Sequence, residues 1–133
     1  MEQRDYLMKQ VEQFGKVLGV LIFFKDNGKL SIEVVNQTFK EELDFDIDEL
    51  ISLCEDDLID FLEDEKQINV KNLEQMADIL SFVAENANSK LCDKFYFMIL
   101  KIYKHLEELE SAYSFDRNVK IAKIKKMIDT NTI

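Results

Sequence analysis

Three alternating aspartates, Asp44, Asp46 and Asp48, form the motif in this chain whose residue types best suit metal chemistry. Together with Glu55, they match the spacing of the carboxylate ligands in a calcium-binding loop. The turn position of that loop requires glycine and is occupied here by Glu49. Because acidic residues also stabilise the positive end of a helix, we interpret the motif as an acidic helix start and expect no metal.

A second group of side chains could serve as nucleophile or base, namely His105, Cys54 and Cys92. His105 and Cys92 are separated by about 20 Å along a continuous helix, too far to pair. The sequence contains no phosphate loop, nucleophile elbow or zinc-ligand spacing. We therefore expect a solvated surface histidine, two reduced and semi-buried cysteines, and a protein that is not an enzyme and has no cofactor.

The charge is strongly negative, with a formal value of −10, and unevenly distributed. Residues 41–65 include thirteen acidic and no basic residues, which disfavours nucleic acid as a partner. We interpret this segment as the solvated face of helices, and recruitment of a basic partner or regulation through it remains the alternative. Near the C-terminus, a polar surface should be supplied by Arg117, Lys120, Lys123, Lys125 and Lys126. Salt bridges to the acidic segment are its simplest role, and anion binding is the alternative.

The composition favours helices in a single domain spanning residues 1–133. Of the 133 residues, 47% are hydrophobic, none is proline and three are glycine, which disfavours a turn-rich β fold. The apolar run Val17–Phe24 is shorter than the roughly 20 residues that span a bilayer. The N-terminus also lacks the pattern of a signal peptide, so we expect a cytoplasmic protein without a membrane segment.

Apolar residues recur at helical spacing along most of the chain. We expect about six helices with antiparallel neighbours, which would form an irregular bundle or a tetratricopeptide-like stack of helical hairpins. The expected helical segments are residues 4–24, about 30–43, 46–62, 69–87, 90–111 and 115–129. The third has its apolar stripe running unbroken from Ile47 through Leu58 to Leu62.

A β-hairpin is the alternative for one region, since apolar residues 20–24 and 30–35 flank an Asn27-Gly28 turn. The helical spacing continues beyond this region to Phe39 and Leu43, outside any short strand. This continuation favours two helices over a hairpin.

The end of the first helix has more apolar residues than a small domain can cover. Leu18, Ile22 and Phe23 are the residues we expect to form an interface with a protein partner or a second copy, and burial within the monomer is the alternative. A ligand pocket between helices is a further hypothesis, and its lining would be Phe95, Tyr96, Tyr103 and Tyr113.

The stretch Gln3–Leu18 has Asp-Tyr near its start and continues as an amphipathic helix containing Gln and Gly. A leucine-rich segment follows at residues 50–62 and a helix pair at residues 73–109. In these features the chain resembles a family of small uncharacterised bacterial proteins with a tetratricopeptide-like helix pair. The resemblance implies an all-α fold and an intracellular location, and it implies no activity. We therefore expect a non-enzymatic interaction or adaptor module, with a ligand-binding or regulatory protein acting through residues 41–65 as the alternative.

Overall fold

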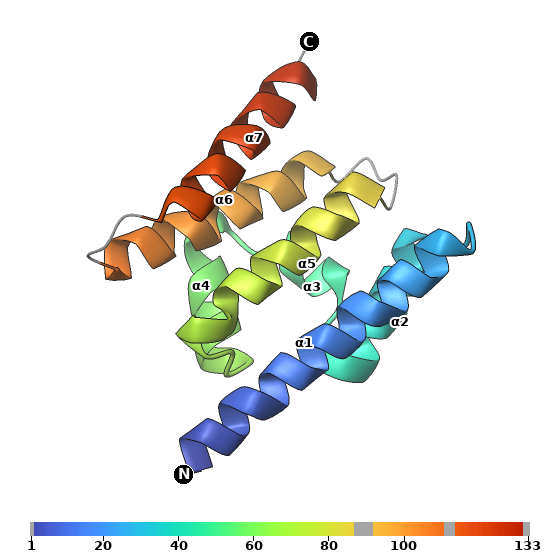
Figure 1. Cartoon of the computed structure of the whole chain (residues 1–133), viewed down its shortest axis with the longest axis horizontal. Coiled ribbons are helices and arrows are strands. Elements are labelled where there is room, and N and C mark those ends of the chain that lie inside the picture. Colours follow the sequence, from blue (N-terminus) through green and yellow to red (C-terminus); the bar gives the residue numbers. More distant parts are fainter. Residues whose placement is uncertain (1, 87–91, 111–113, 132–133) are drawn as a thin grey trace.

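The computed structural model describes residues 2–86, 92–110 and 114–131, and these are all-α (Figure 1). No strand occurs within these ranges, which confirms the expected fold class. The helices are α1 (Glu2–Asp26), α2 (Ile32–Leu43), α3 (Ile47–Ile51), α4 (Leu58–Asp60), α5 (Leu73–Asn86), α6 (Cys92–Leu109) and α7 (Phe115–Asn131). Short 3-10 turns occupy Glu55–Asp57 and Val70–Asn72, and a π-helical turn occupies Phe61–Glu65.

The region with two competing predictions is a pair of helices, and the hairpin alternative is wrong. Gly28 has a φ of 70° in the turn after α1, a conformation that glycine adopts without strain. Ser31 precedes α2, and its side-chain oxygen accepts a hydrogen bond of 3.2 Å from the backbone N–H of Val34. This cap satisfies a backbone donor at the helix start and fixes the direction in which α2 returns along α1.

The predicted continuous helix over 46–62 is wrong, because α3 ends at Ile51 and the chain turns before α4. The hydroxyl of Ser52 donates to the carbonyl of Glu49 at 2.8 Å, which competes with helix continuation. Continuation would also place the Glu55–Asp57 run in the middle of a helix, away from the positive end where acidic residues are stabilised. In the observed structure this acidic run instead precedes α4, where the helix dipole favours negative charge.

The centre of the molecule is the antiparallel pair α5 and α6, with α1 lying alongside α5 on one side and α7 beside α6 on the other (Figure 1). The buried side chains form one continuous cluster to which all of these helices contribute. Met76 and Leu80 of α5 and Phe95 and Ile99 of α6 are completely buried within it. α1 also packs against α2, which returns along it, whereas α7 contacts chiefly α6.

Candidate interaction surface

One face of α1 packs against the core. Phe14, Val17 and Leu21 follow one another at helical spacing, and each is at most 2% exposed. Burial of apolar side chains of this size is the main stabilising contribution at a helix–core contact. These residues fix α1 against the rest of the molecule along the middle of its length.

A buried polar contact adds directional constraint to this attachment. The side-chain amide of Gln10 donates to the carbonyl of Gln67 at 2.6 Å. Its oxygen accepts from the backbone N–H of Asn69 at 3.1 Å and from the side chain of Asn72 at 2.7 Å. Gln10 is 6% exposed, so these bonds satisfy a group whose burial would otherwise be costly. They set the position of α1 relative to the start of α5.

The opposite side of α1 has a long apolar strip, which we call the α1 face and define by seven residues. These are Met8, Val11, Gly15, Leu18, Gly19, Ile22 and Phe23. Five of them follow one another at alternating offsets of three and four residues, which is the spacing of the seam between two packed helices. These five are Met8, Val11, Gly15, Leu18 and Ile22. Met8 is 55% exposed and Phe23 is 63% exposed, so the strip is open to solvent at both ends.

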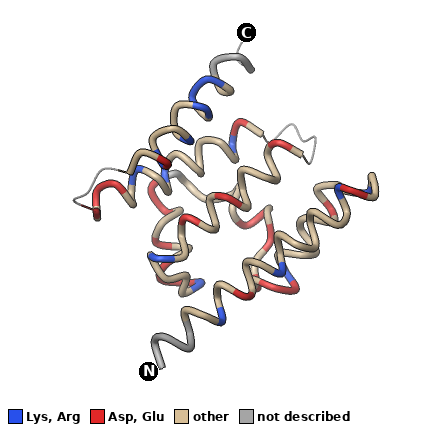
Figure 2. The backbone as a smooth tube through the Cα atoms, viewed as in Figure 1, with Lys and Arg blue, Asp and Glu red and all other residues tan. Residues whose placement is uncertain are grey.

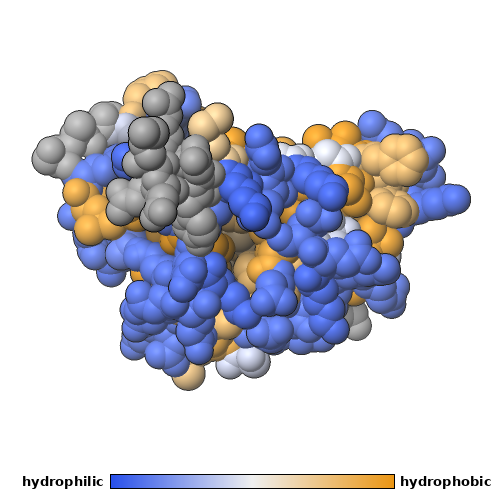
Figure 3. All heavy atoms as spheres, turned by 90° about the horizontal axis from the view of Figure 1, so that it is seen from below, coloured by the Kyte–Doolittle hydropathy of each residue, from blue (hydrophilic) through white to orange (hydrophobic). Residues whose placement is uncertain are grey.

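Gly15 and Gly19 lie in the middle of the α1 face, before and after Leu18, and have no side chains. A Cβ atom built at Gly15 or Gly19 would meet nothing within 4 Å. A second backbone could therefore approach closely there. Figure 3 views the molecule from the side along which α1 runs, and hydrophobic residues are visible among the charged ones, mainly toward the end where α1 terminates beside α2.

The three residues predicted as an interface all belong to the α1 face. Ile22 is 40% exposed, Phe23 is more exposed still, and Leu18 is half-buried at the edge of the strip. The prediction that the interface lies near the end of the helix omitted Met8 and Val11. Met8 lies two heptads before Ile22 and Val11 one heptad before Leu18, so this spacing could have revealed both from the sequence.

The aspartates of the calcium-like motif have structural roles. The Asp46 carboxylate caps α3 by accepting from the backbone N–H of Glu49 at 2.8 Å. Asp44 ends α2 with a φ of 63°, and its carbonyl accepts from the Lys66 ammonium at 3.0 Å. Asp48 is an exposed residue in the first turn of α3. Among the residues that the structure describes, no group of three His, Cys, Asp or Glu side chains is placed to hold a metal ion.

His105 is not the solvated residue that we expected. Its Nε2 atom lies 2.8 Å from a carboxylate oxygen of Glu63, and its side chain is 25% exposed. The sequence could not reveal this contact because Glu63 comes from the distant π-helical turn. Cys92 is half-buried as predicted, and its thiol donates to the carbonyl of Ala84 at 3.1 Å. Cys54 is exposed instead of semi-buried, because the chain turns away from a helix before reaching it.

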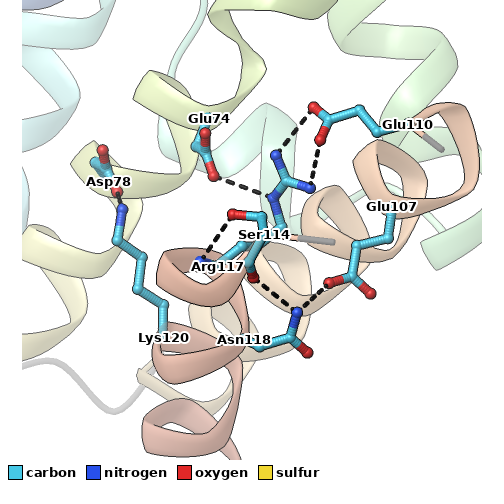
Figure 4. Close-up of polar contacts among 8 residues, drawn as sticks. All are labelled: Glu74, Asp78, Glu107, Glu110, Ser114, Arg117, Asn118 and Lys120. Atoms are coloured by element: carbon cyan, nitrogen blue, oxygen red, sulfur yellow. Dashed lines mark hydrogen bonds and ion pairs between the residues drawn. The ribbon is translucent and has the colours of Figure 1, made fainter. Parts of the chain in front are cut away.

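In the described part of the chain, Arg117, Lys120 and Lys123 do not form the predicted ion pairs with the acidic segment. Carboxylates of residues 41–65 form ion pairs with Lys16, Lys40 and Lys101. Figure 2 shows basic residues recurring along α7. Three of them form ion pairs with Glu74, Asp78 and Glu85 of α5, and Arg117 also pairs with Glu110, which directly follows α6. Lys120, for example, lies 3.1 Å from Asp78 (Figure 4).

Arg117 was predicted to be part of a polar surface, but it is 4% exposed. Its guanidinium donates two hydrogen bonds of 3.0 Å to the two oxygens of Glu110 and one of 3.1 Å to Glu74 (Figure 4). A planar guanidinium matches a carboxylate in this bidentate geometry. Ser114 begins α7 by accepting from the Arg117 backbone N–H at 3.2 Å. One buried arginine thus joins α7 to both α5 and α6.

The aromatic residues proposed to line a ligand pocket belong to the core. Phe95, Tyr96 and Tyr103 are each at most 4% exposed, and Tyr113 lies outside the described residues. Burial raises the pKa of both tyrosines, so their phenol groups remain neutral at physiological pH. Phe95 and Tyr96 therefore pack in the core. Tyr103 lines a pocket of about 180 Å³ between α5 and α7, whose other lining residues in the described part of the chain include Asp78 and Lys120 and none of the predicted aromatic residues.

No helix in the described ranges has a stretch long and apolar enough to cross a bilayer. No family model, curated protein or solved structure matches this chain.

Proposed function

We propose that this protein is a non-enzymatic helical interaction module and that the α1 face is where it docks an apolar helix of a protein partner or of a second copy. The observation that carries the proposal is an exposed apolar strip along a helix of 25 residues. An extended apolar patch of this kind is uncommon on the surface of a monomer and is typical of an interface.

Two features support helix docking in particular. The core contacts of Phe14, Val17 and Leu21 hold α1 in place, so little conformational entropy is lost when a partner binds. Gly15 and Gly19 lie in the middle of the strip and permit close backbone approach, while Ile22 and Phe23 offer side chains that can enter a partner's surface. Anchors at one end of such a face fit recognition of an amphipathic helix.

The test compares two exposed phenylalanines of the same chain. Phe23→Glu should abolish self-association in sedimentation experiments, or abolish capture of one specific protein from the native cell extract. Burying a side chain of this size is worth about 1.5–3 kcal/mol, so the loss should be tenfold or more in affinity. Phe115→Glu is the matched control, because Phe115 is 72% exposed on α7.

Circular dichroism and thermal unfolding verify that both variants fold. If Phe115→Glu weakens association as much as Phe23→Glu, or if neither variant changes it, the α1 face is not the interface and the proposal is wrong.

A further inference from the structure

A pocket separate from the α1 face lies between α6 and the segment that joins α3 to α4. Its volume is about 230 Å³. Leu50 and Leu58, each 2% exposed, belong to the apolar part of its wall. From α6 come Phe97 and Met98. The pocket exists because α3 ends at Ile51, so that the chain turns away from α6 before returning in α4.

The charged side chains that line this pocket are positive, whereas the net charge of the chain is negative. Lys94 and Lys101 both line the pocket, and none of the acidic side chains that the structure describes does, although the chain as a whole has a charge of −10. The two lysines are two turns apart on α6, with Phe97 and Met98 between them. An apolar pocket bordered by two cations is complementary to a molecule with an apolar body and an anionic group.

The lysines are available to such an anion. Lys94 forms no ion pair with any residue in the described part of the chain. Lys101 lies 3.5 Å from Asp56, whose side chain is 95% exposed. An ion pair this exposed contributes little, so an incoming carboxylate could replace Asp56 at low cost.

We propose that this pocket binds an amphiphilic carboxylate, with the class of medium-chain fatty acids as its occupant. The chain would lie among Leu50, Leu58 and Phe97, and the carboxylate would lie between Lys94 and Lys101. At roughly 30 Å³ per water-sized group, the pocket of about 230 Å³ accommodates about seven or eight carbon-sized groups. This size matches the carbon chain of octanoate, with its carboxylate oxygens outside the apolar part of the pocket, at the two lysines. The inference does not depend on the proposed function, because the pocket and the α1 face share no residue.

Cys54 provides a reporter for the test, because it is exposed and lines the pocket. In a Cys92→Ser protein, Cys54 is the single thiol, and its alkylation by neutral iodoacetamide can be followed by mass spectrometry. Octanoate should slow this reaction saturably, and calorimetry should give the same dissociation constant. Each methylene from hexanoate to octanoate should tighten binding about fourfold, and longer chains should add less.

The anion specificity is tested with octan-1-ol and with paired lysine variants. The double variant Lys94→Gln, Lys101→Gln should bind octanoate roughly fivefold more weakly and octan-1-ol unchanged. Lys104→Gln is the matched control, since Lys104 is an exposed lysine of α6 that does not line the pocket. Cys54→Trp should fill the pocket and remove the calorimetric signal.

Three results would overturn the inference. The first is the absence of protection and heat at millimolar octanoate, below its micelle concentration. The second is octan-1-ol binding as tightly as octanoate, which would indicate an apolar surface that accepts other partners, including a protein helix. The third is a Lys104→Gln effect equal to that of the double variant. None of these results bears on association through Phe23.

Discussion

The outer helices α1 and α7 are attached to the central pair by different forces. α1 is held by a row of fully buried apolar side chains and by the uncharged hydrogen bonds of Gln10. α7 is held chiefly by Arg117, which bonds two carboxylates, with Ile124 as its buried apolar contact. Its remaining ion pairs, such as Lys123 with Glu85, are solvent-exposed and contribute little.

This difference affects what each helix can do. Apolar attachment depends weakly on salt and pH, so α1 offers the same outer face under most conditions. Attachment through ionised groups depends on their protonation and on ionic strength. α1 is therefore suited to be a constant docking surface, whereas α7 is the helix that a change in conditions can release.

The largest loss of stability should come from Phe14→Ala, which removes a buried side chain from the face of α1 that packs against the core. A cavity of this size costs about 3–5 kcal/mol of unfolding free energy. The loss should be global in urea denaturation, since α1 shares its core with α5. Val11→Ala is the control, because Val11 is 43% exposed on the same helix. Equal losses for the two variants would contradict the buried attachment of α1.

The sequence predicted the helices correctly where residues of the helix itself set its boundaries. Helical spacing decided between helix and hairpin at residues 20–35, and the aspartate motif was interpreted as a helix start, which α3 confirms. The break after Ile51 was missed because the hydrophobic period continues through it. The helix dipole and the hydroxyl of Ser52 oppose that period locally.

The candidate surface was predicted less completely, because it depends on how the helices pack against one another. Spacing alone cannot say which apolar face of α1 meets the core, since both faces carry apolar residues. Arg117 shares the helical face of Ile121, Ile124 and Ile128, so its spacing already indicated burial. Its carboxylate partners, however, come from α5 and α6, and their arrangement depends on the tertiary structure.

An intermediate effect is expected from Arg117→Ala, which removes the contact joining α7 to α5 and α6. Breaking a fully buried ion pair costs more, but both carboxylates here are partly exposed and can be hydrated, so the loss should be about 2 kcal/mol. Hydrogen exchange should accelerate in α7 while α1 and α5 remain protected. Lys123→Ala is the control and should change stability by at most about 0.5 kcal/mol. Uniform acceleration across all helices would show that α7 does not open separately.

The smallest expected effect is the detachment of α7 from the central helices at acidic pH. It is also the most selective effect, because α1 should stay attached. The hydrogen bonds from Arg117 lower the pKa of Glu110 below its ordinary value of 4.5. Undocked Glu110 therefore binds a proton more readily than docked Glu110, so the stabilisation is complete above about pH 4.5 and is lost as the pH falls through the lowered value. Amide NMR signals of α7 should shift toward those of an undocked helix in this range, before those of α1.

The matched control for this titration is Glu110→Gln, which keeps the side-chain size and removes the titrating group. In that variant the acid-dependent shift of the α7 signals should be reduced, while the α1 signals should titrate as in the unmodified chain. The hydrogen bonds that Gln10 makes to Asn69 and Asn72 involve no ionisable group, so nothing in that contact should change with pH. Simultaneous acid release of both helices, unaffected by Glu110→Gln, would mean that α7 is held by its apolar contacts, as α1 is, and that the contrast between the two attachments is wrong.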